Sequence, residues 1–497
     1  MNQTNKKRGI RRRTKIIATL GPALEDRSVL KDMIAAGANV LRLNFSHGDP
    51  DSWVRHAQAV REVSAELGRE VAILADLAGP KIRIEHFRNG SIALHKGDTF
   101  TLDTSDTETP GDENRVGVNY PSLAEDVSPG VLLLLDDGLI AMRVSGIEGK
   151  LIHCVVETGG VLRNRKGLNI RGGGLSVSGI TEKDIDDIPI AARLEADYVA
   201  VSFVTNGDDI RKARKLLRQA GSNAGVIAKI ERSEAIVSLE EICETADAIL
   251  VARGDLGVEI GDAALPGIQK RIINTAVEYN RNVITATQMM LSMVDSPIPT
   301  RAEVLDVANA VIDGTDAVML SEETAVGKHP TTVVEAVDRV CLGAERHSEE
   351  NDDIKQLNVR FQRIDQAIAM AATFLSTNVS VQAIVAFTES GSTALWLSRV
   401  QSPVPIFALS PCASTRRKMA LYRNVIPVAH VPQGDSMNVV VTEALKLLWD
   451  HDAITVGDRI ILTMGERQGD QGGTNTMRLI RIGPEGRAEH QAELDMH

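Results

Sequence analysis

Aromatic residues and cysteines are scarce in this chain. Phe, Trp and Tyr make up 3% of its 497 residues, so its cores must be built mainly from aliphatic side chains. The four cysteines lie far apart and form no CxxC pair, which excludes a disulfide framework and a zinc site built on paired cysteines. We therefore expect a reduced, cytoplasmic protein.

Long apolar runs are also lacking. No run approaches the ~18 apolar residues of a membrane helix. The basic start, from Lys6 to Arg13, could be mistaken for the first part of a secretion signal. The segment that follows, Lys15–Leu20, is too short for the apolar core of about 7–15 residues that a signal needs. We interpret the start as a solvated basic tail and expect no membrane association.

Positive charge is in deficit. Lys plus Arg number 55 against 67 for Asp plus Glu, which gives a formal net charge of −12. This balance argues against nonspecific nucleic-acid binding, and an anionic substrate would have to meet a local cluster of Arg and Lys. The length predicts about three domains, and a hydrophobic content of 43% is ample for several cores.

Eight short apolar runs each end at a polar or charged residue. Seven of them precede a stretch with helical character, and the third precedes a long insertion. Apolar runs that alternate with helices are typical of parallel strands, because helices cover both faces of such a sheet. Eight units predict a (β/α)8 TIM barrel whose reactive groups gather where the strands end. These ends are Thr19, Asn44, Asp76, Ser202, Lys229, Arg253, Thr287 and Ser321.

The residues after the third run, 79–174, break the barrel pattern. Short β-rich runs are separated there by Asn89-Gly90, Lys96-Gly97, Asp137-Gly138 and Glu148-Gly149, which are hairpin signals. We predict an inserted all-β domain that returns to the barrel at the glycines 172–174. Because it leaves from a strand end, it emerges on the face that carries the site and can act as a lid. The alternative is an insertion at the rim with no role at the site.

The barrel then comprises residues 1–78 and 175–346, and a third domain follows at 347–497. The polar stretch 347–355 is interpreted as a linker. Beyond it, strands are expected at 383–387, 406–409, 425–429 and 460–464, alternating with helices. This order predicts a small, doubly wound α/β domain.

Two neighbouring strand ends combine a cation with two carboxylates. Alternation along the strand places Lys229 and Glu231 on one side, and Asp255 follows the next run in a glycine-rich turn. Two carboxylates suit a divalent cation such as Mg²⁺, which keeps waters and binds substrate oxygens. Lys229 beside it would neutralise a developing oxyanion or a phosphoryl group. The alternative is an internal ion pair.

Other strand ends supply groups that bind anions. The backbone amides of Gly254 and Asp255, with the hydroxyl of Thr287, form a candidate carboxylate site, because glycine permits close backbone approach. Arg42 is a candidate phosphate fork. Arg83 follows the third strand end, and two arginines at adjacent ends favour a functional role over a solvated surface charge.

Six stretches, in order along the chain, resemble the pyruvate kinase family. They are LNFSHG at 43–48, GPKIR at 79–83, IAKIE at 227–231, VARGDLG at 251–257, ATQM at 286–289 and MLS at 319–321. The resemblance runs from about residue 13 to the end and includes the insertion and the third domain. It implies transfer of a phosphoryl group from phosphoenolpyruvate to ADP, giving pyruvate and ATP in the last step of glycolysis.

The resemblance assigns roles at the phosphoryl group and the metal. Arg42 and Lys229 would contact the transferring phosphoryl group. Glu231 and Asp255 would hold Mg²⁺, or Mn²⁺ in its place. These roles agree with the chemistry of the residues, because phosphoryl transfer depends mostly on positioning and on charge neutralisation.

The resemblance also assigns the pyruvate and nucleotide sites. Gly254, Asp255 and Thr287 would bind the pyruvate carboxylate, and Thr287 with Ser321 would organise protonation of the enolate. The residues expected at the nucleotide are Arg83, Lys166 and His47.

The third strand end departs from the usual family pattern. Many pyruvate kinases need K⁺ and carry a glutamate where this chain has Lys81, and an Asp-Thr-Lys sequence where it has Asp76-Leu77-Ala78. A lysine ammonium carries the same single charge as K⁺. We therefore expect Lys81 to replace the ion, as in other lysine-bearing bacterial members, so that K⁺ is not required. Its expected neighbours are Asn44, Ser46, Asp76 and Leu77, of which Asn44 and Ser46 share a strand face with Arg42. The alternative is a solvated lysine at the root of the lid.

In the third domain, small hydroxyl residues join a strand to a helix and form a candidate anion site. They lie in a segment that binds a phosphorylated effector in pyruvate kinases, with Gly472–Asn475 as part of a loop that closes over it. We expect allosteric activation by a sugar phosphate or a nucleotide monophosphate; the alternative is an ordinary helix cap. The candidate residues are Thr388, Ser390, Gly391, Ser392 and Thr393. The resemblance also implies a homotetramer.

Two other functions remain open on the sequence alone. A Mg²⁺-dependent lyase or aldolase acting on pyruvate enolate would also use an acidic pair on a barrel, but it would not need Lys166 and Arg83. A noncatalytic effector-binding protein would not need Lys229 with two metal carboxylates.

Overall fold

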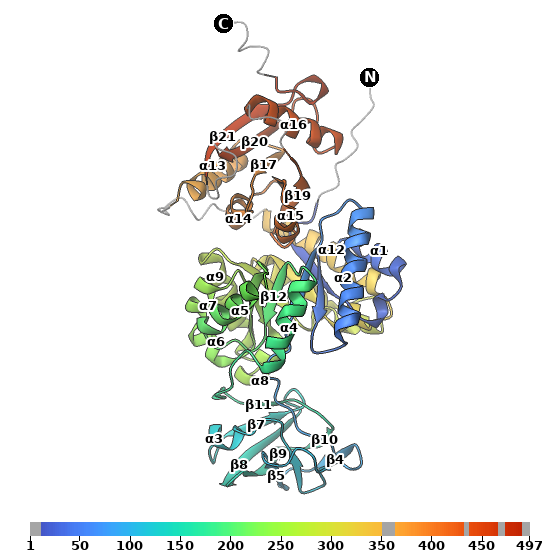
Figure 1. Ribbon diagram of the computed structural model, residues 1–497, viewed down its shortest axis with the longest axis vertical. Helices are drawn as coiled ribbons and strands as arrows, with labels where there is room; N and C mark the ends of the chain where they lie inside the picture. The colour runs from blue at the N-terminus through green and yellow to red at the C-terminus, as the bar shows by residue number, and fades with distance from the viewer. Residues whose placement is uncertain (1–10, 350–362, 432–436, 466–472, 490–497) are drawn as a thin grey trace.

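The computed structural model describes residues 11–349, 363–431, 437–465 and 473–489. They form three bodies stacked along the longest axis, with a closed barrel in the middle, small sheets at one end and an α/β unit at the other (Figure 1). No helix within these ranges is long and apolar enough to cross a membrane.

Parallel strands close the barrel in the order β1-β16-β15-β14-β13-β12-β3-β2. Each of the eight expected strands is present and ends within one residue of its predicted polar end, so the predicted TIM barrel is confirmed. The strands are almost entirely buried, because apolar side chains fill the barrel and helices cover its outside. They are β1 (Lys15–Thr19), β2 (Val40–Asn44), β3 (Ala72–Asp76), β12 (Tyr198–Val201), β13 (Gly225–Ile230), β14 (Ala248–Ala252), β15 (Asn282–Ala286) and β16 (Ala317–Leu320).

Helices follow the strands and surround the barrel. Local sequence fixes their starts: for α4, Thr181 accepts a hydrogen bond from the backbone N–H of Asp184, whose side chain in turn binds the backbone N–H of Thr181. They are α1 (Arg27–Ala36), α2 (Pro50–Glu66), α4 (Glu182–Arg193), α5 (Gly207–Gln219), α6 (Ser233–Val237), α7 (Leu239–Thr245), α8 (Arg253–Ile260), α9 (Leu265–Glu278), α10 (Arg301–Ile312), α11 (Glu322–Ala325) and α12 (Pro330–Glu349).

The insertion between β3 and α4 forms a six-stranded sheet and a two-stranded sheet, with one helical turn, α3 (Leu123–Asp126). It lies beyond the carboxyl ends of the barrel strands (Figure 1). The six-stranded sheet has the order β11-β7-β8-β9-β5-β6, and β10 pairs with β4. The strands are β4 (Ser91–Leu94), β5 (Thr99–Asp103), β6 (Arg115–Gly117), β7 (Leu132–Leu135), β8 (Ile140–Glu148), β9 (Leu151–Thr158), β10 (Gly160–Arg163) and β11 (Leu168–Ile170).

Two of the four expected hairpin turns join paired strands. Asp137-Gly138 connects β7 to β8, and Glu148-Gly149 connects β8 to β9, both antiparallel pairs. The other two predictions were wrong as hairpins: Lys96-Gly97 joins β4 to β5, which lie in different sheets, and Asn89-Gly90 precedes β4. A turn dipeptide marks where the chain reverses, whereas pairing depends on the sheet that each strand joins.

The third unit is a five-stranded sheet with the order β19-β18-β17-β20-β21. Four strands are parallel and match the prediction, whereas β21 is an additional antiparallel edge strand. Thr474 and Asn475, expected in a loop, instead begin β21, and Gly472 lies outside the described residues. The elements are α13 (Ile364–Asn378), β17 (Ala383–Phe387), α14 (Ser392–Arg399), β18 (Ile406–Ser410), α15 (Ala413–Met419), β19 (Val425–Ala429), α16 (Met437–Asp450), β20 (Arg459–Gly465) and β21 (Thr474–Arg481).

The third unit packs on the amino ends of the barrel strands, opposite the insertion (Figure 1). Ala420 and Leu421 belong to the same apolar cluster as the side chains inside the barrel and close it at this end. The hydroxyl of Tyr198 donates a hydrogen bond of 2.8 Å to the carbonyl of Lys418. The carboxyl ends of the strands therefore face the insertion alone.

Candidate active site at the carboxyl ends of the barrel strands

Arg42 is held at the mouth of the barrel by two strand-end residues. Its Nε donates to Asp76 Oδ2 at 2.6 Å and its Nη1 to Thr19 Oγ1 at 3.0 Å. The Arg42 side chain is mostly buried, so these partners fix the direction of its guanidinium. Thr19, a strand end without a predicted role, thus orients an anion-binding candidate.

Lys229 lies among oxygen atoms from three strand ends. Its Nζ donates to Ser202 Oγ at 2.7 Å and lies 3.0 Å from Glu231 Oε1 and 3.4 Å from Asp76 Oδ1. Burial by itself lowers the pKa of this lysine, but Asp76 and Glu231 outweigh burial and raise it above its usual value. Lys229 is therefore a fixed cation, and Ser202 acquires a role as its hydrogen-bond partner.

Asp76 lies between the two cations. Burial favours its neutral form, but Lys229 and Arg42 lower its pKa below the usual value, so it is an anion. The sequence placed Asp76 beside Lys81 instead. The structure joins it to Arg42 and Lys229, where it holds both side chains toward the mouth.

Glu231 and Asp255 form the expected pair of carboxylates. Glu231 Oε2 accepts a hydrogen bond of 2.7 Å from the backbone N–H of Phe203, which orients the carboxylate. Burial raises the pKa of Glu231; Lys229 opposes the rise and the charge of Asp255 adds to it. A divalent cation would relieve that repulsion, so the pair fits a metal. No group of three or more His, Cys, Asp or Glu side chains among the described residues is arranged for a metal, so water and substrate oxygens would complete the coordination.

A glycine-rich turn was predicted after β14. The segment instead forms the first turn of α8. Its glycines adopt helical conformations without a break, which the local sequence does not favour. The backbone N–H of Gly254 donates to Thr287 Oγ1 at 3.0 Å. Helix N-termini present backbone N–H groups to anions, so Gly254, Asp255 and Thr287 lie together at a site suited to a carboxylate.

Arg253 holds the turn that carries Thr287. Its Nε donates to the carbonyl of Ala286 at 3.1 Å, its Nη2 to the carbonyl of Thr287 at 2.5 Å and its Nη1 to Asp306 at 2.7 Å. Thr287 and Gln288 have φ values of +66° and +55°, in the left-handed region that residues other than glycine rarely adopt. The strand end Arg253 therefore stabilises the backbone instead of facing the mouth.

The described ion pair of Lys81 is with Asp255, which the sequence did not predict as its neighbour. Its Nζ is 3.6 Å from Asp255 Oδ1, and no hydrogen bond or ion pair in the described chain joins it to Asn44, Ser46 or Asp76. Asn44 Oδ1 instead accepts from the backbone N–H of Ser46 at 3.1 Å. The grouping of Lys81 with Asn44, Ser46 and Asp76 stays a prediction, because the path of the chain after Gly79 decides where the ammonium lies.

Leu77, the other predicted neighbour of Lys81, is buried. Its backbone N–H donates to the carbonyl of Ala200 at 3.0 Å, and its own carbonyl accepts from Ser202 Oγ at 2.8 Å. Leu77 thus supports the hydroxyl that binds Lys229, and its place beside Lys81 stays a prediction.

Two nucleotide candidates lie close together in the insertion. Arg83 Nη1 donates to the carbonyl of Arg165 at 2.9 Å, and Lys166 Nζ pairs with Asp136 at 2.7 Å. Both side chains are partly exposed. His47 lies on the barrel after β2 with an exposed side chain, and no described contact joins it to either of them.

Ser321 is positioned by a glutamate that the sequence did not single out. Glu323 is buried and accepts from the backbone N–H of Ser321 at 2.6 Å and of Met290 at 3.1 Å. It thereby links the end of β16 to the loop after Thr287. No periodicity marks it, because it lies in the single turn of α11.

The candidate effector segment forms a compact turn before α14. Thr388 Oγ1 accepts from the backbone N–H of Gly391 at 2.9 Å, and Gly391 has φ +85°, which favours glycine. Thr393 Oγ1 lies 2.6 Å from Thr474 Oγ1, so the start of β21 does meet this segment. The hydroxyls of Ser390 and Ser392 are 3.2 Å apart at the exposed side.

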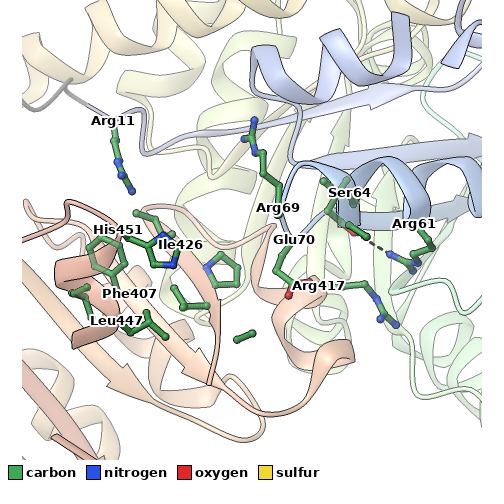
Figure 2. A pocket seen from close by; sticks show the side chains of 17 residues that line it. Arg11, Arg61, Ser64, Arg69, Glu70, Phe407, Arg417, Ile426, Leu447 and His451 are labelled. Carbon is green, nitrogen blue, oxygen red and sulfur yellow. Dashed lines mark hydrogen bonds between the residues drawn. The ribbon is translucent and has the colours of Figure 1, made fainter. Parts of the chain in front are cut away.

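A cavity of about 540 Å³ lies at the other end of the barrel, against the third unit (Figure 2). Arg11, Arg69 and Arg417 approach it from three directions over an apolar floor that includes Phe407. None of the predicted site residues lines it. It is separate from the strand-end constellation.

Comparison with known proteins gives a consistent picture. Residues 11–334 match the model of the pyruvate kinase barrel domain, and residues 366–480 match that of the pyruvate kinase alpha/beta domain. Pyruvate kinase II of Salmonella typhimurium is 49% identical over 475 residues, which cover 95% of this chain and 99% of the relative. A pyruvate kinase of Haemophilus influenzae is 46% identical over 469 residues, covering 94% of this chain and 97% of the relative.

Proposed function

We propose that this chain, which belongs to the pyruvate kinase family, transfers the phosphoryl group of phosphoenolpyruvate to ADP as the last step of glycolysis. The observation that carries this proposal is the cluster at the barrel mouth. There Asp76 pairs with both Arg42 and Lys229, beside the carboxylate of Glu231. A dianionic phosphoryl group needs such a preorganised set of positive charges.

Arg42 and Lys229 would bind the phosphoryl oxygens. Because both side chains are already oriented by hydrogen bonds, little reorganisation is needed when charge moves toward the transferred group. Lys229 would then stay beside the oxygen of the enolate that remains. Its raised pKa keeps it charged throughout.

Glu231 and Asp255 would hold Mg²⁺, or Mn²⁺ in its place. The bound ion would supply positive charge to substrate oxygens. The backbone N–H groups at the start of α8, with the Thr287 hydroxyl, would hold the substrate carboxylate so that its reacting end points at Lys229. Thr287 and Ser321 would organise the water or relay that protonates the enolate carbon.

The insertion would act as a lid that carries Arg83 and Lys166 to the nucleotide phosphates, with His47 approaching from the barrel. Its location over the strand ends supports this role. Closing it would exclude water, which otherwise competes with ADP for the phosphoryl group. A lyase or aldolase would have no use for these two cations.

The test is a product assay. Purified protein with Mg²⁺, ADP and phosphoenolpyruvate should form ATP and pyruvate in equal amounts. Folded protein that forms neither would contradict the proposal. Aldol or cleavage products in place of ATP would favour the lyase alternative.

We also propose that activity does not require K⁺. Lys81 supports this, because its ammonium lies 3.6 Å from Asp255 and so supplies a monovalent charge at the mouth. The charge acts next to the metal carboxylate instead of through Asn44, Ser46 and Asp76.

We propose allosteric activation by a phosphorylated metabolite at the Thr388–Thr393 segment. The hydroxyls gathered there and the contact with Thr474 support it. Calorimetric titration with ribose 5-phosphate, glucose 6-phosphate and AMP tests it, and no heat with any of them would contradict it. If a ligand binds, loss of binding in Thr393→Val locates it here, whereas loss in Arg69→Met locates it in the cavity of Figure 2.

We propose a homotetramer located in the cytoplasm. The surface around α10 supports assembly, because Ile298, Leu305 and Ile312 are 71%, 63% and 48% exposed. Light scattering should give four times the chain mass, and Leu305→Glu should lower it. A wild-type monomer would contradict the proposal. The free thiols of the described cysteines agree with a reducing compartment.

A further inference from the structure

The return of the insertion to the barrel is tied to the segment that carries Glu231. The chain comes back through Gly172, Gly173 and Gly174, which all have positive φ and so form a natural hinge. A Cβ at Gly173 would lie 2.1 Å from Ser233 Oγ, which shows how closely the hinge passes over the start of α6. The hinge therefore crosses directly over the residues that follow Glu231.

Arg232 makes the main connection. Its side chain is 1% exposed, and its Nη2 and Nη1 donate to the carbonyls of Leu175 at 2.7 Å and Val177 at 3.3 Å, just beyond the hinge. It also pairs with Glu234 at 3.2 Å, and Glu234 accepts from the backbone N–H of Gly174 at 2.6 Å. One guanidinium thus holds the returning segment to the barrel at two carbonyls.

A second connection runs parallel to the first. The carboxylate of Glu259, on α8, accepts from the backbone N–H of Ser233 at 2.9 Å, and its carbonyl accepts from the N–H of Gly172 at 3.0 Å. Lys81 and Asp255 line the same small cavity as Arg232 and Glu259. The outgoing and returning arms of the insertion therefore meet beside Asp255, at a cavity that both arms line.

The arrangement leaves one buried donor unused. Arg232 Nε has no hydrogen-bond partner among the described residues. A buried donor without a partner is costly in a native structure. A position of the hinge that brings an acceptor to Arg232 Nε would therefore be lower in free energy than the position described here. Arg232 could therefore gain a contact when the hinge moves.

We propose that Arg232 is a positioning residue that couples the position of the lid to the placement of the Glu231 carboxylate. It rests on the proposed function, in which Glu231 is a metal ligand and the insertion is the lid. When the hinge moves, the carbonyls of Leu175 and Val177 move the guanidinium, and the backbone of Arg232 is continuous with that of Glu231. Because coupling is reciprocal, a cation bound by Glu231 shifts the lid equilibrium in turn.

The test measures the lid and the metal separately. Fluorophores are attached at Lys96→Cys in the insertion and Lys212→Cys on α5, both exposed, in a Cys412→Ser background; the other cysteines are buried. Energy transfer reports the lid equilibrium with and without Mg²⁺. Binding of Mn²⁺ alone, followed by the electron paramagnetic resonance of the free ion, reports the metal site without relying on activity.

In the parent protein, saturating Mg²⁺ should change the lid equilibrium constant by at least about fivefold. In Arg232→Lys, which keeps the charge but loses the two-carbonyl fork, the change should fall below about twofold while Mn²⁺ still binds. Arg281→Lys is the matched control, because Arg281 also donates to two carbonyls, Cys243 at 2.6 Å and Glu244 at 3.0 Å, away from the insertion. It should respond to Mg²⁺ like the parent.

A lid in Arg232→Lys that responds to Mg²⁺ as the parent does would overturn the inference, and so would a parent lid that ignores Mg²⁺ while Mn²⁺ binds. A parent protein that binds no Mn²⁺ would overturn the proposed metal site as well, which separates the two failures. If Arg232→Lys does not fold, Glu234→Gln replaces it. That variant should lose part of the response, and an unchanged response there would also overturn the coupling.

Discussion

At the scale of single residues, the mouth of the barrel is a set of charges that hold one another. Asp76 pairs with Arg42 and lies 3.4 Å from Lys229, and Lys229 in turn pairs with Glu231. Each of the four side chains is at most 12% exposed, and removal of any one charge would leave its partner uncompensated. Such a set remains ordered before substrate arrives, which is the condition for electrostatic catalysis.

Replacing Lys229 by Met should lower kcat about 10²–10³-fold, because the cation beside the phosphoryl group and the enolate is lost. Steady-state kinetics with phosphoenolpyruvate and ADP measure the loss. Lys212→Met, on the exposed face of α5, is the control and should leave kcat unchanged. A folded Lys229→Met protein with kcat near the wild-type value would remove this lysine from the chemistry.

Replacing Lys81 by Glu should create a requirement for K⁺. The wild-type protein should be equally active with and without KCl when tetramethylammonium replaces other monovalent cations. Lys81→Glu removes the ammonium near Asp255, so its activity should be low without KCl and rise when KCl is added. Wild-type activity that depends on KCl would disprove the role of Lys81. Lys81→Met, which offers no carboxylate for K⁺, should show no rescue.

At the scale of elements, the strand ends and the hinge decide what the site can do. The barrel could be predicted because its strands are continuous apolar runs that stop where the mouth begins. The edge strand β21 could not be predicted, because its sequence TNTMRLIR contains no apolar run and half of its residues are exposed. The place of Lys81 could not either, since it depends on how the insertion leaves Gly79. Long-range packing, not local pattern, sets both.

Glu259 makes the hinge region sensitive to pH. Burial raises its pKa from 4.5 to about 7, although the N–H of Ser233 opposes the rise. The folded protein therefore binds more protons than the unfolded chain between these values, and stability falls as pH rises through this interval. Above about pH 7 the stability that neutral Glu259 contributes is lost.

Glu259→Gln should therefore stabilise the protein at about pH 8, by up to about 3 kcal/mol, and have little effect at about pH 5, where Glu259 is already neutral. The amide oxygen can still accept from Ser233. Thermal unfolding at the two pH values measures the difference. A variant that is destabilised equally at both would show that the carboxylate is not the source of the pH dependence.

At the scale of the whole molecule, the third unit closes the end of the barrel that is remote from the chemistry. Ion pairs cross this interface: Arg399 on α14 pairs with Asp316, both buried, and the partly exposed Arg417 on α15 pairs with the buried Asp197. Asp316 precedes β16, whose other end carries Ser321. The proposed effector segment before α14 would thus be connected through Arg399 and Asp316 to β16. No motif indicates these pairs in the sequence, because each partner belongs to a different unit.

Replacing Arg399 by Met should lower the free energy of unfolding by about 3–5 kcal/mol, because it leaves the buried carboxylate of Asp316 uncompensated. Denaturant titration measures the change. Arg27→Met is the control: Arg27 also pairs with carboxylates, Glu62 and Glu66, but in exposed positions, so its loss should matter little. Equal effects of the two changes would contradict the importance of the interface pair.

The most direct test of the whole account follows the phosphorus atom itself. Phosphorus NMR of the purified protein with Mg²⁺, ADP and phosphoenolpyruvate, in buffer free of K⁺, should show the phosphoenolpyruvate signal decline as the γ-phosphate signal of ATP grows to match it. Lys229→Met should slow both changes together. Inorganic phosphate in place of ATP, or an unchanged phosphoenolpyruvate signal with folded protein, would contradict phosphoryl transfer at this site.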